Sequence, residues 1–340
     1  MLLLPYRDSS MLRTAPVVTA LIVLACALVL FGVQSQDPGR EREAVEFYRG
    51  SGLGQIEQPR YQAYLADRND PDAAARLHLL ERAAPGSVDA LRILQSDGRF
   101  LADLHAGRVV PPSDPAYVAW SADRRRFDQL AGAVAQAQYS LSRAQIDQPW
   151  RFVTYAFLHN GLAHFLGNML VLVLVGPFVE AAMGQARFAL AYLAGAAAAG
   201  LLHVAVSDAP VIGASGAIAA AVGMLAVSYG TRRVPVFYWF IIFGTARVPA
   251  LALLPVWLVN EGYQWTLQSH AAPGGGAVAY GAHIGGLCAG ALLAWMLTPP
   301  APVEARGRAG GPGTLGGAGA AGTADRRPTG SMLVLSLIHI

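Results

Sequence analysis

Six long apolar stretches restrict the fold of this sequence more than any other feature. They cover residues 16–33, 162–180, 188–206, 210–229, 236–262 and 278–297. Each approaches the roughly 20 residues that a helix needs to cross about 30 Å of hydrocarbon. Hydrophobic residues make up 54% of the chain and charged residues only 14%, which is not the composition of a soluble globule. We therefore predict an all-α membrane protein with a bundle of six transmembrane helices.

Arginine predicts the orientation of these helices, because an excess of basic residues marks the cytoplasmic side of short loops. Arginines lie before the first stretch, after the second, the fourth and the sixth: Arg7, Arg13, Arg187, Arg232, Arg233, Arg306 and Arg308. The opposite loops, 207–209 and 263–277, contain none. We expect a multi-pass protein of a bacterial inner membrane with both termini in the cytoplasm, residues 1–15 forming the N-terminal one.

The first and fifth stretches each allow two interpretations. Residues 16–33 lack a small-residue cleavage site, so we interpret them as an uncleaved helix rather than a signal peptide. Arg247 and Pro249 interrupt the fifth stretch, and a charge at the bilayer centre costs about 2.5–3.5 kcal/mol. Either residues 234–246 lie along the inner interface and the crossing begins near Arg247, an interfacial anchor, or this arginine has a function.

The segment between the first two stretches, residues 34–149, is a soluble insertion. It holds 16 of the 22 acidic residues and 14 of the 25 basic ones. Its sequence has helical spacing over 60–65, 72–82 and 117–137, which predicts a small helical unit on the extracytoplasmic side. Residues 299–334 are rich in Gly, Ala and Pro and are predicted to be a disordered cytoplasmic tail. The last six residues, 335–340, match the translation of a library-preparation transposon end, so we interpret them as a sequencing artefact that replaces the native terminus.

Four polar side chains inside the predicted helices lie at one depth. They are His164 and Asn168 in the second helix, Ser215 in the fourth and His283 in the sixth. Even-numbered helices run in the same direction, and each residue falls within the first two turns of its helix, roughly 5–10 Å below the outer surface. Polar residues inside a membrane are expensive and are usually functional.

This layer is suited to acyl transfer. A serine hydroxyl needs a base to accept its proton, and His283 is suited to that near neutral pH, so Ser215 and His283 form the candidate dyad. His164 and Asn168, one helical turn apart, can supply oxyanion donors together with the Ser215 backbone N–H. Small residues near both members of the dyad allow the two helices to approach closely: Gly213, Gly216, Gly285, Gly286 and Gly290.

Four motifs together resemble the rhomboid family over residues 150–297. They are the pair Trp150-Arg151, the spacing His164-x-x-x-Asn168, Gly213-x-Ser215-Gly216 and Ala282-His283-x-Gly285-Gly286. The resemblance implies a rhomboid core at 150–298, a water-filled cavity open to the outside, and cleavage of single-span membrane-protein substrates near their outer end. It implies no metal and no cofactor. Glu180 matches a family position that holds helices together.

One position departs from the pattern of the family. Many members carry an aromatic residue four positions after the serine, where it stacks on the histidine, and this chain has Ala219 there. His283 must therefore be oriented in another way, for which we consider Tyr280 or a neighbouring backbone group.

Other classes of function fit the sequence less well. The arginines are scattered, so a nucleic-acid partner is not expected; the expected partners are the lipid bilayer and membrane-protein substrates. A His-Glu-x-x-His metal motif and a pair of intramembrane aspartates are both missing from the sequence. Cys26 and Cys288 lie in apolar runs and are interpreted as packing residues. The main alternative is a non-catalytic rhomboid-like protein that binds or chaperones membrane proteins.

Overall fold

The computed structural model describes residues 2–5, 15–68, 70–239, 243–269 and 278–298. The predicted tail at 299–334, the segment 335–340 and most of the N-terminal segment 1–15 lie outside these residues.

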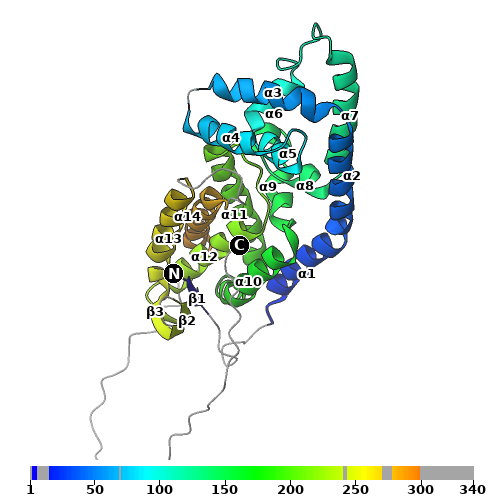
Figure 1. The fold of residues 1–340 in the computed structure, drawn as a ribbon. Helices are drawn as coiled ribbons and strands as arrows, with labels where there is room; N and C mark the ends of the chain where they lie inside the picture. The colour runs from blue at the N-terminus through cyan, green and yellow to red at the C-terminus, as the bar shows by residue number, and fades with distance from the viewer. Residues whose placement is uncertain (1, 6–14, 69, 240–242, 270–277, 299–340) are drawn as a thin grey trace, which may run out of the picture. The chain divides into compact units, whose positions relative to one another are not determined.

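The described residues outside the insertion form mainly long helices (Figure 1). They are α1 (Val17–Phe31), α10 (Gly161–Met183), α11 (Gln185–Val206), α12 (Ser215–Tyr229), α13 (Leu253–Ser269) and α14 (Tyr280–Leu297). Within the described ranges, four helical segments are long and apolar enough to cross a membrane: Val17–Gly50, Gly161–Met183, Gln185–Val206 and Tyr280–Leu297. The prediction of a helical, multi-pass membrane bundle is confirmed.

α12 is the central helix of this bundle. Every residue from Gly216 to Ala226 is buried, so the helix is apolar on all sides, as a core helix must be. It begins at Ser215, five residues later than the predicted start at 210, because Pro210 and Gly213 belong to an irregular segment. Gly213 has φ +117°, a conformation that side-chain-bearing residues rarely adopt.

α10, α12 and α14 run parallel, and their first turns lie at the same end. His164 lies against Gly213 at the start of α12, while the Tyr229 hydroxyl at its end donates to the Phe178 carbonyl of α10 (3.2 Å). α1 runs antiparallel to α10, because its first turn meets the last turns of α10 and Phe31 at its end packs on Phe165.

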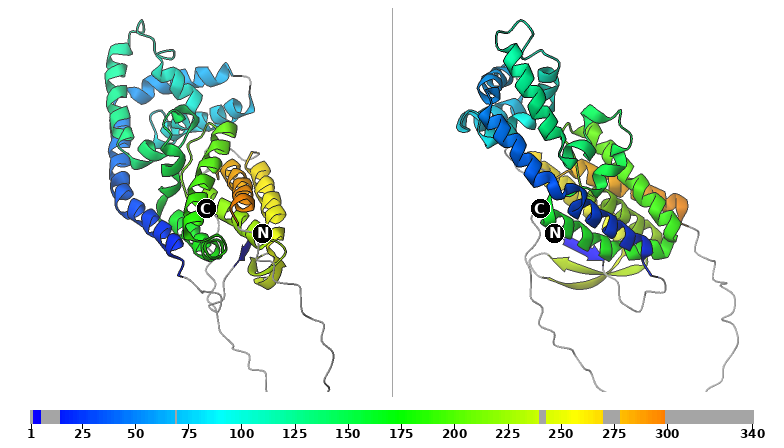
Figure 2. Two further views of the ribbon diagram at one scale, coloured as in Figure 1. Left: turned by 180° about the vertical axis from the view of Figure 1, so that it is seen from behind. Right: turned by 90° about the vertical axis from the view of Figure 1, so that its right-hand side faces the viewer.

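The prediction of a helix over the first half of the fifth stretch, 236–262, is wrong. Here β2 (Arg233–Trp239) pairs antiparallel with β3 (Phe243–Pro249), and β1 (Leu2–Pro5) extends the sheet in the order β1-β2-β3 (Figure 2). β-Branched and aromatic residues favour strands, and Pro235 and Pro249, near the first residue of β2 and at the last of β3, disfavour a helix. Arg247 is an exposed residue of β3, opposite Pro235, and therefore does not lie within a helix.

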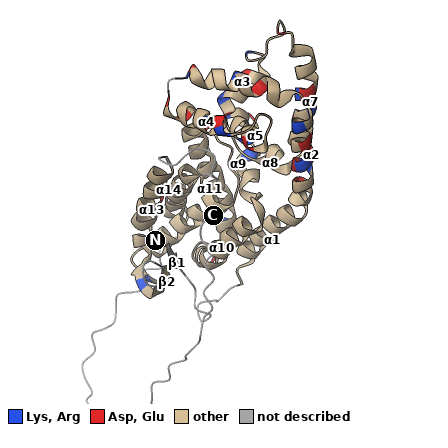
Figure 3. Ribbon diagram, viewed as in Figure 1, with Lys and Arg blue, Asp and Glu red and all other residues tan. Residues whose placement is uncertain are grey.

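The insertion folds into helices with their own apolar core. The helices are α2 (Asp37–Gly50), α3 (Leu53–Ala66), α4 (Pro71–Arg82), α5 (Val88–Gln95), α6 (Gly98–His105), α7 (Tyr117–Gly132) and α8 (Ala135–Tyr139). Tyr48, Tyr61, Phe100 and Phe127 are buried at the centre of this core. Charged residues gather on these helices and are sparse on α10–α14 (Figure 3). This contrast is the one expected between a water-exposed unit and a lipid-exposed one.

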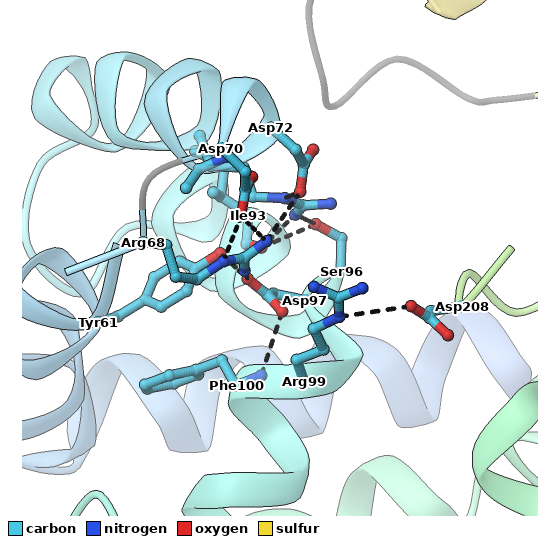
Figure 4. A network of polar contacts seen from close by, with 12 residues as sticks. Tyr61, Arg68, Asp70, Asp72, Ile93, Ser96, Asp97, Arg99, Phe100 and Asp208 are labelled. Atoms are coloured by element: carbon cyan, nitrogen blue, oxygen red, sulfur yellow. Dashed lines mark hydrogen bonds and ion pairs between the residues drawn. The ribbon is translucent and has the colours of Figure 1, made fainter. Parts of the chain in front are cut away.

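Asp97 is the centre of a polar network in the insertion (Figure 4). It caps α6 by accepting from the Phe100 N–H (3.1 Å), and it also accepts from Arg68 (3.0 Å) and the Tyr61 hydroxyl (3.1 Å). Arg68 also binds Asp70, and the Ala73 N–H together with Arg68 lowers the pKa of Asp70. The network therefore joins the end of α3 to the first turns of α4 and α6.

Candidate active site

Ser215, the predicted nucleophile, is the first residue of α12. The turn before it is held from outside the helix, because the Gly213 N–H donates to the Tyr155 carbonyl (2.9 Å) and the Tyr155 hydroxyl donates to Ala196 (2.8 Å). Ser215 is half-buried. The first N–H groups of a helix have no acceptor within that helix, so the backbone beside Ser215 can donate to an incoming oxygen atom.

His164 lies directly against this turn. A Cβ built on Gly213 would be 2.8 Å from Cε1 and 3.0 Å from Nε2 of the His164 ring. The Asn160 N–H donates to His164 Nδ1 (3.1 Å), so the neutral ring carries its proton on Nε2. His164 therefore presents an N–H donor to the turn that carries Ser215.

Asn168 lies one turn further along α10 and is buried. Its amide donates one N–H to the His164 carbonyl (3.0 Å). An amide nitrogen carries two hydrogen atoms, so a second donor remains for another acceptor. α10 thus supplies donors at the end where α12 begins.

α12 and α14 approach each other backbone to backbone. A Cβ on Gly286 would overlap the Gly216 carbonyl oxygen, and one on Gly290 would overlap that of Ala220. Such contacts are typical of small-residue packing between membrane helices. A Cβ on Gly216 would be 3.5 Å from the Ala282 carbonyl oxygen. Ser215 is adjacent to Gly216 in the chain and His283 is adjacent to Ala282, so this contact brings both to the same end of the helix pair.

His283 makes a polar contact that the sequence analysis did not foresee. Its Nδ1 lies 2.8 Å from Oε2 of Glu261 on α13. The Tyr280 ring meets the imidazole edge-on at 6.0 Å between centroids, and Ala219 is buried. Within the described parts of the chain, the Ser215 hydroxyl makes no hydrogen bond.

Sequence reasoning missed Glu261, although a signal was available. It is the only acidic residue between Asp208 and Glu304. A lone carboxylate in an apolar helix must find a partner, because an unpaired charge in lipid is expensive. Among the described residues, no three His, Cys, Asp or Glu side chains gather in a way that could hold a metal ion.

The pair Trp150-Arg151 lies before α10. Trp150 is exposed, whereas Arg151 is buried and donates to the carbonyls of Ala137 (3.1 Å) and Ser140 (2.7 Å) and to Gln148. Arg151 thus holds the segment before α10 against the chain around Ala137 and Ser140.

Glu180 joins α10 to the first turn of α1. Its carboxylate accepts from the N–H groups of Val18 (3.0 Å) and Thr19 (3.0 Å) and from the Thr19 hydroxyl (2.9 Å). A carboxylate at a helix N-terminus satisfies unpaired N–H groups and complements the helix dipole.

Replacing Glu180 with alanine is expected to lower the free energy of unfolding by ~2–4 kcal/mol, since three donors lose a charged acceptor at once. Thermal unfolding in detergent micelles measures this effect. Thr19→Val is the matched control, because it removes only one of the three hydrogen bonds and should cost about 1 kcal/mol. Equal unfolding midpoints for Glu180→Ala and the wild type would contradict this assignment.

The family model that describes the rhomboid domain matches residues 147–300. Rhomboid protease GluP of Bacillus subtilis is 31% identical over 152 residues, which are 44% of this chain and 26% of that protein. Human Rhomboid-related protein 3 is 44% identical over 82 residues, 24% of this chain and 19% of the relative. Mouse Rhomboid-related protein 2 is 25% identical over 186 residues, 53% and 58% of the two chains.

This chain therefore spans between 19% and 58% of the length of these relatives. The matched region begins before Trp150 and ends after α14, so it includes all four motifs and the helices that carry them. Residues 147–300 of this chain are a rhomboid domain.

Proposed function

We propose that this chain is an intramembrane serine endopeptidase, in which Ser215 is the nucleophile and His283 is the general base. The observation that carries the proposal is the packing of α12 on α14, which puts the turns of Ser215 and His283 side by side at one end of two parallel helices. The His164 ring lies against the same turn. One similar protein, from Bacillus subtilis, is named a rhomboid protease.

The proposed reaction is acyl transfer through an ester on Ser215. The Ser215 proton passes to Nε2 of His283 as Oγ bonds to the scissile carbonyl carbon, whose π electrons move onto oxygen. The imidazolium then gives its proton to the leaving amine as the C–N bond breaks. Water attacks the ester in the same way, releasing the carboxylate product and restoring Ser215.

The developing oxyanion would be stabilised by three donors: the Ser215 backbone N–H, the Nε2–H of His164 and the Asn168 amide. The His164 tautomer supports this role, since Nδ1 is occupied as an acceptor. Donors of this kind act only where charge develops, which is why they accelerate the chemical step.

We further propose a topology in the inner membrane of a bacterium. Both termini would be cytoplasmic, and the site and the insertion would lie on the extracytoplasmic side, with α12 and α13 completing six crossings. Substrates would be single-span membrane proteins cut near the outer end of their transmembrane segment. The arginine distribution around the loops supports this orientation.

The alternative is a non-catalytic rhomboid-like protein that binds membrane proteins. It is favoured by one observation, that the Ser215 hydroxyl makes no hydrogen bond to any described residue. Catalytic hydrogen bonds are often loose before substrate binds, so this geometry is compatible with both functions.

A serine-directed phosphonate tests the proposal. We expect the probe to label the detergent-solubilised protein, with peptide mass spectrometry locating the adduct on Ser215. Ser228, on the same helix, is an internal control, because its hydroxyl bonds Thr298 (3.0 Å) with no histidine as partner. A reporter with a destabilised transmembrane helix should also be cut. If the protein takes up no probe and cuts no reporter, the binding function replaces the protease.

A further inference from the structure

Glu261 is a buried carboxylate in the middle of α13, directly after the apolar first half of the helix. α13 reads Leu-Leu-Pro-Val-Trp-Leu-Val-Asn-Glu-Gly-Tyr from Leu253, and Glu261 is only 7% exposed. Removing a charge from water costs several kcal/mol unless a partner compensates it. A side chain this expensive needs a specific role.

The partner of Glu261 is the proposed general base. Oε2 of Glu261 lies 2.8 Å from Nδ1 of His283, and both side chains are largely buried. An ionised carboxylate can only accept a hydrogen bond, so Nδ1 is the protonated nitrogen of the ring. Nε2 of the neutral imidazole then carries the lone pair, which is the state that a general base requires.

We propose that Glu261 is a positioning residue that holds His283 in this tautomer and orientation, making a Ser215–His283–Glu261 arrangement across α12, α14 and α13. The inference rests on the proposed protease function. It also provides an anchor for the ring where Ala219 offers only a methyl group and Tyr280 only an edge contact. A carboxylate at this position also stabilises the imidazolium that forms when Ser215 loses its proton.

A purely structural role for Glu261, holding α13 against α14, needs a separate test. A second polar contact joins α13 to the residues just before α14: the Gln268 amide donates to the Val278 carbonyl (2.9 Å) and accepts from the Val278 N–H (2.8 Å). This contact does not include His283. Gln268→Ala is therefore the matched control for a loss of helix attachment.

The experiment compares wild type, Glu261→Gln, Glu261→Asp and Gln268→Ala in detergent. Kinetics on the reporter should give a fall in kcat of about 100-fold or more for Glu261→Gln with KM within about threefold, because the amide can donate to Nδ1 and invert the tautomer. Glu261→Asp should recover part of kcat, and Gln268→Ala should stay within about threefold of wild type. Nitrogen NMR of ¹⁵N-histidine protein, with His283→Ala to assign the signal, should show protonated Nδ1 in wild type and a changed tautomer in Glu261→Gln.

Two results would overturn the inference. One is a Glu261→Gln variant with wild-type kcat and an unchanged His283 signal. The other is an equal loss of kcat in Gln268→Ala, which would assign Glu261 to helix attachment alone. If wild type cuts no reporter, the protease function fails, while the NMR comparison still decides whether Glu261 sets the tautomer of His283.

Discussion

Alanine at Ser215 or at His283 is expected to reduce reporter cleavage by about 10⁴-fold or more. The nucleophile and its base act as one unit, so removing either leaves only the contribution of binding and of the oxyanion donors. Both side chains are half-buried at the end of their helices, and neither substitution opens a large core cavity. Initial rates with the reporter, together with unfolding midpoints, measure the two effects separately.

Ser228→Ala is the matched control for Ser215→Ala. It also removes a serine hydroxyl from α12, but near the opposite end of the helix. The Ser228→Ala variant should cleave the reporter at a rate within about twofold of wild type, because substitutions away from the site usually have small effects. Cleavage by Ser215→Ala within tenfold of wild type would mean that the nucleophile lies elsewhere.

Alanine at Gly286 is expected to cost about 3 kcal/mol of stability and about 100-fold in kcat/KM. Its Cβ would overlap the Gly216 carbonyl oxygen, so the helices must separate for the methyl group to fit. Gly286 lies three residues from His283, and Gly216 is adjacent to Ser215. A displacement of about 1 Å between reacting groups can cost 10²-fold in rate.

The control for this change is Gly167→Ala on α10. A Cβ at Gly167 meets nothing within 4 Å, so alanine there should be tolerated. Thermal unfolding and reporter kinetics on both variants give the comparison. A Gly286→Ala protein with wild-type rate and midpoint would show that the close contact between α12 and α14 is not needed.

The residues of the candidate site could be singled out from the sequence because polar side chains are rare and costly inside apolar helices. His164, Ser215 and His283 stood out for that reason, and the glycines around them predicted a close helix contact, which α12 and α14 make. The sequence did not predict which group orients His283 in place of the aromatic residue that many family members carry at the position of Ala219. Which residue orients His283 depends on how α13 is rotated against α14, and apolar periodicity does not define that rotation.

The paired strands before α13 show a second limit of predicting the fold from the sequence. A run of apolar residues is compatible with a strand or a helix, and both interpretations of the stretch 236–262, a helix interrupted at Arg247 or an interfacial segment at 234–246, leave out the strands. Pro235 and Pro249 were the local signals against a helix there. The predicted stretch ends at 262 and so puts Glu261 at its last turn, whereas α13 extends to Ser269 and Glu261 lies at its middle.

The shortness of α12 has a consequence for water. Fifteen residues give a helix of about 22 Å, less than the ~30 Å of hydrocarbon around it. The irregular chain before Ser215 continues from the first turn of the helix, and its backbone groups pair with protein: Val211 with Leu141, and Gly213 with Tyr155. Backbone of this kind is tolerated at such depth only beside protein or a wet cavity. In the protease proposed above, the segment before Ser215 would therefore lie against protein rather than lipid, and the water consumed in hydrolysis would reach Ser215 beside it.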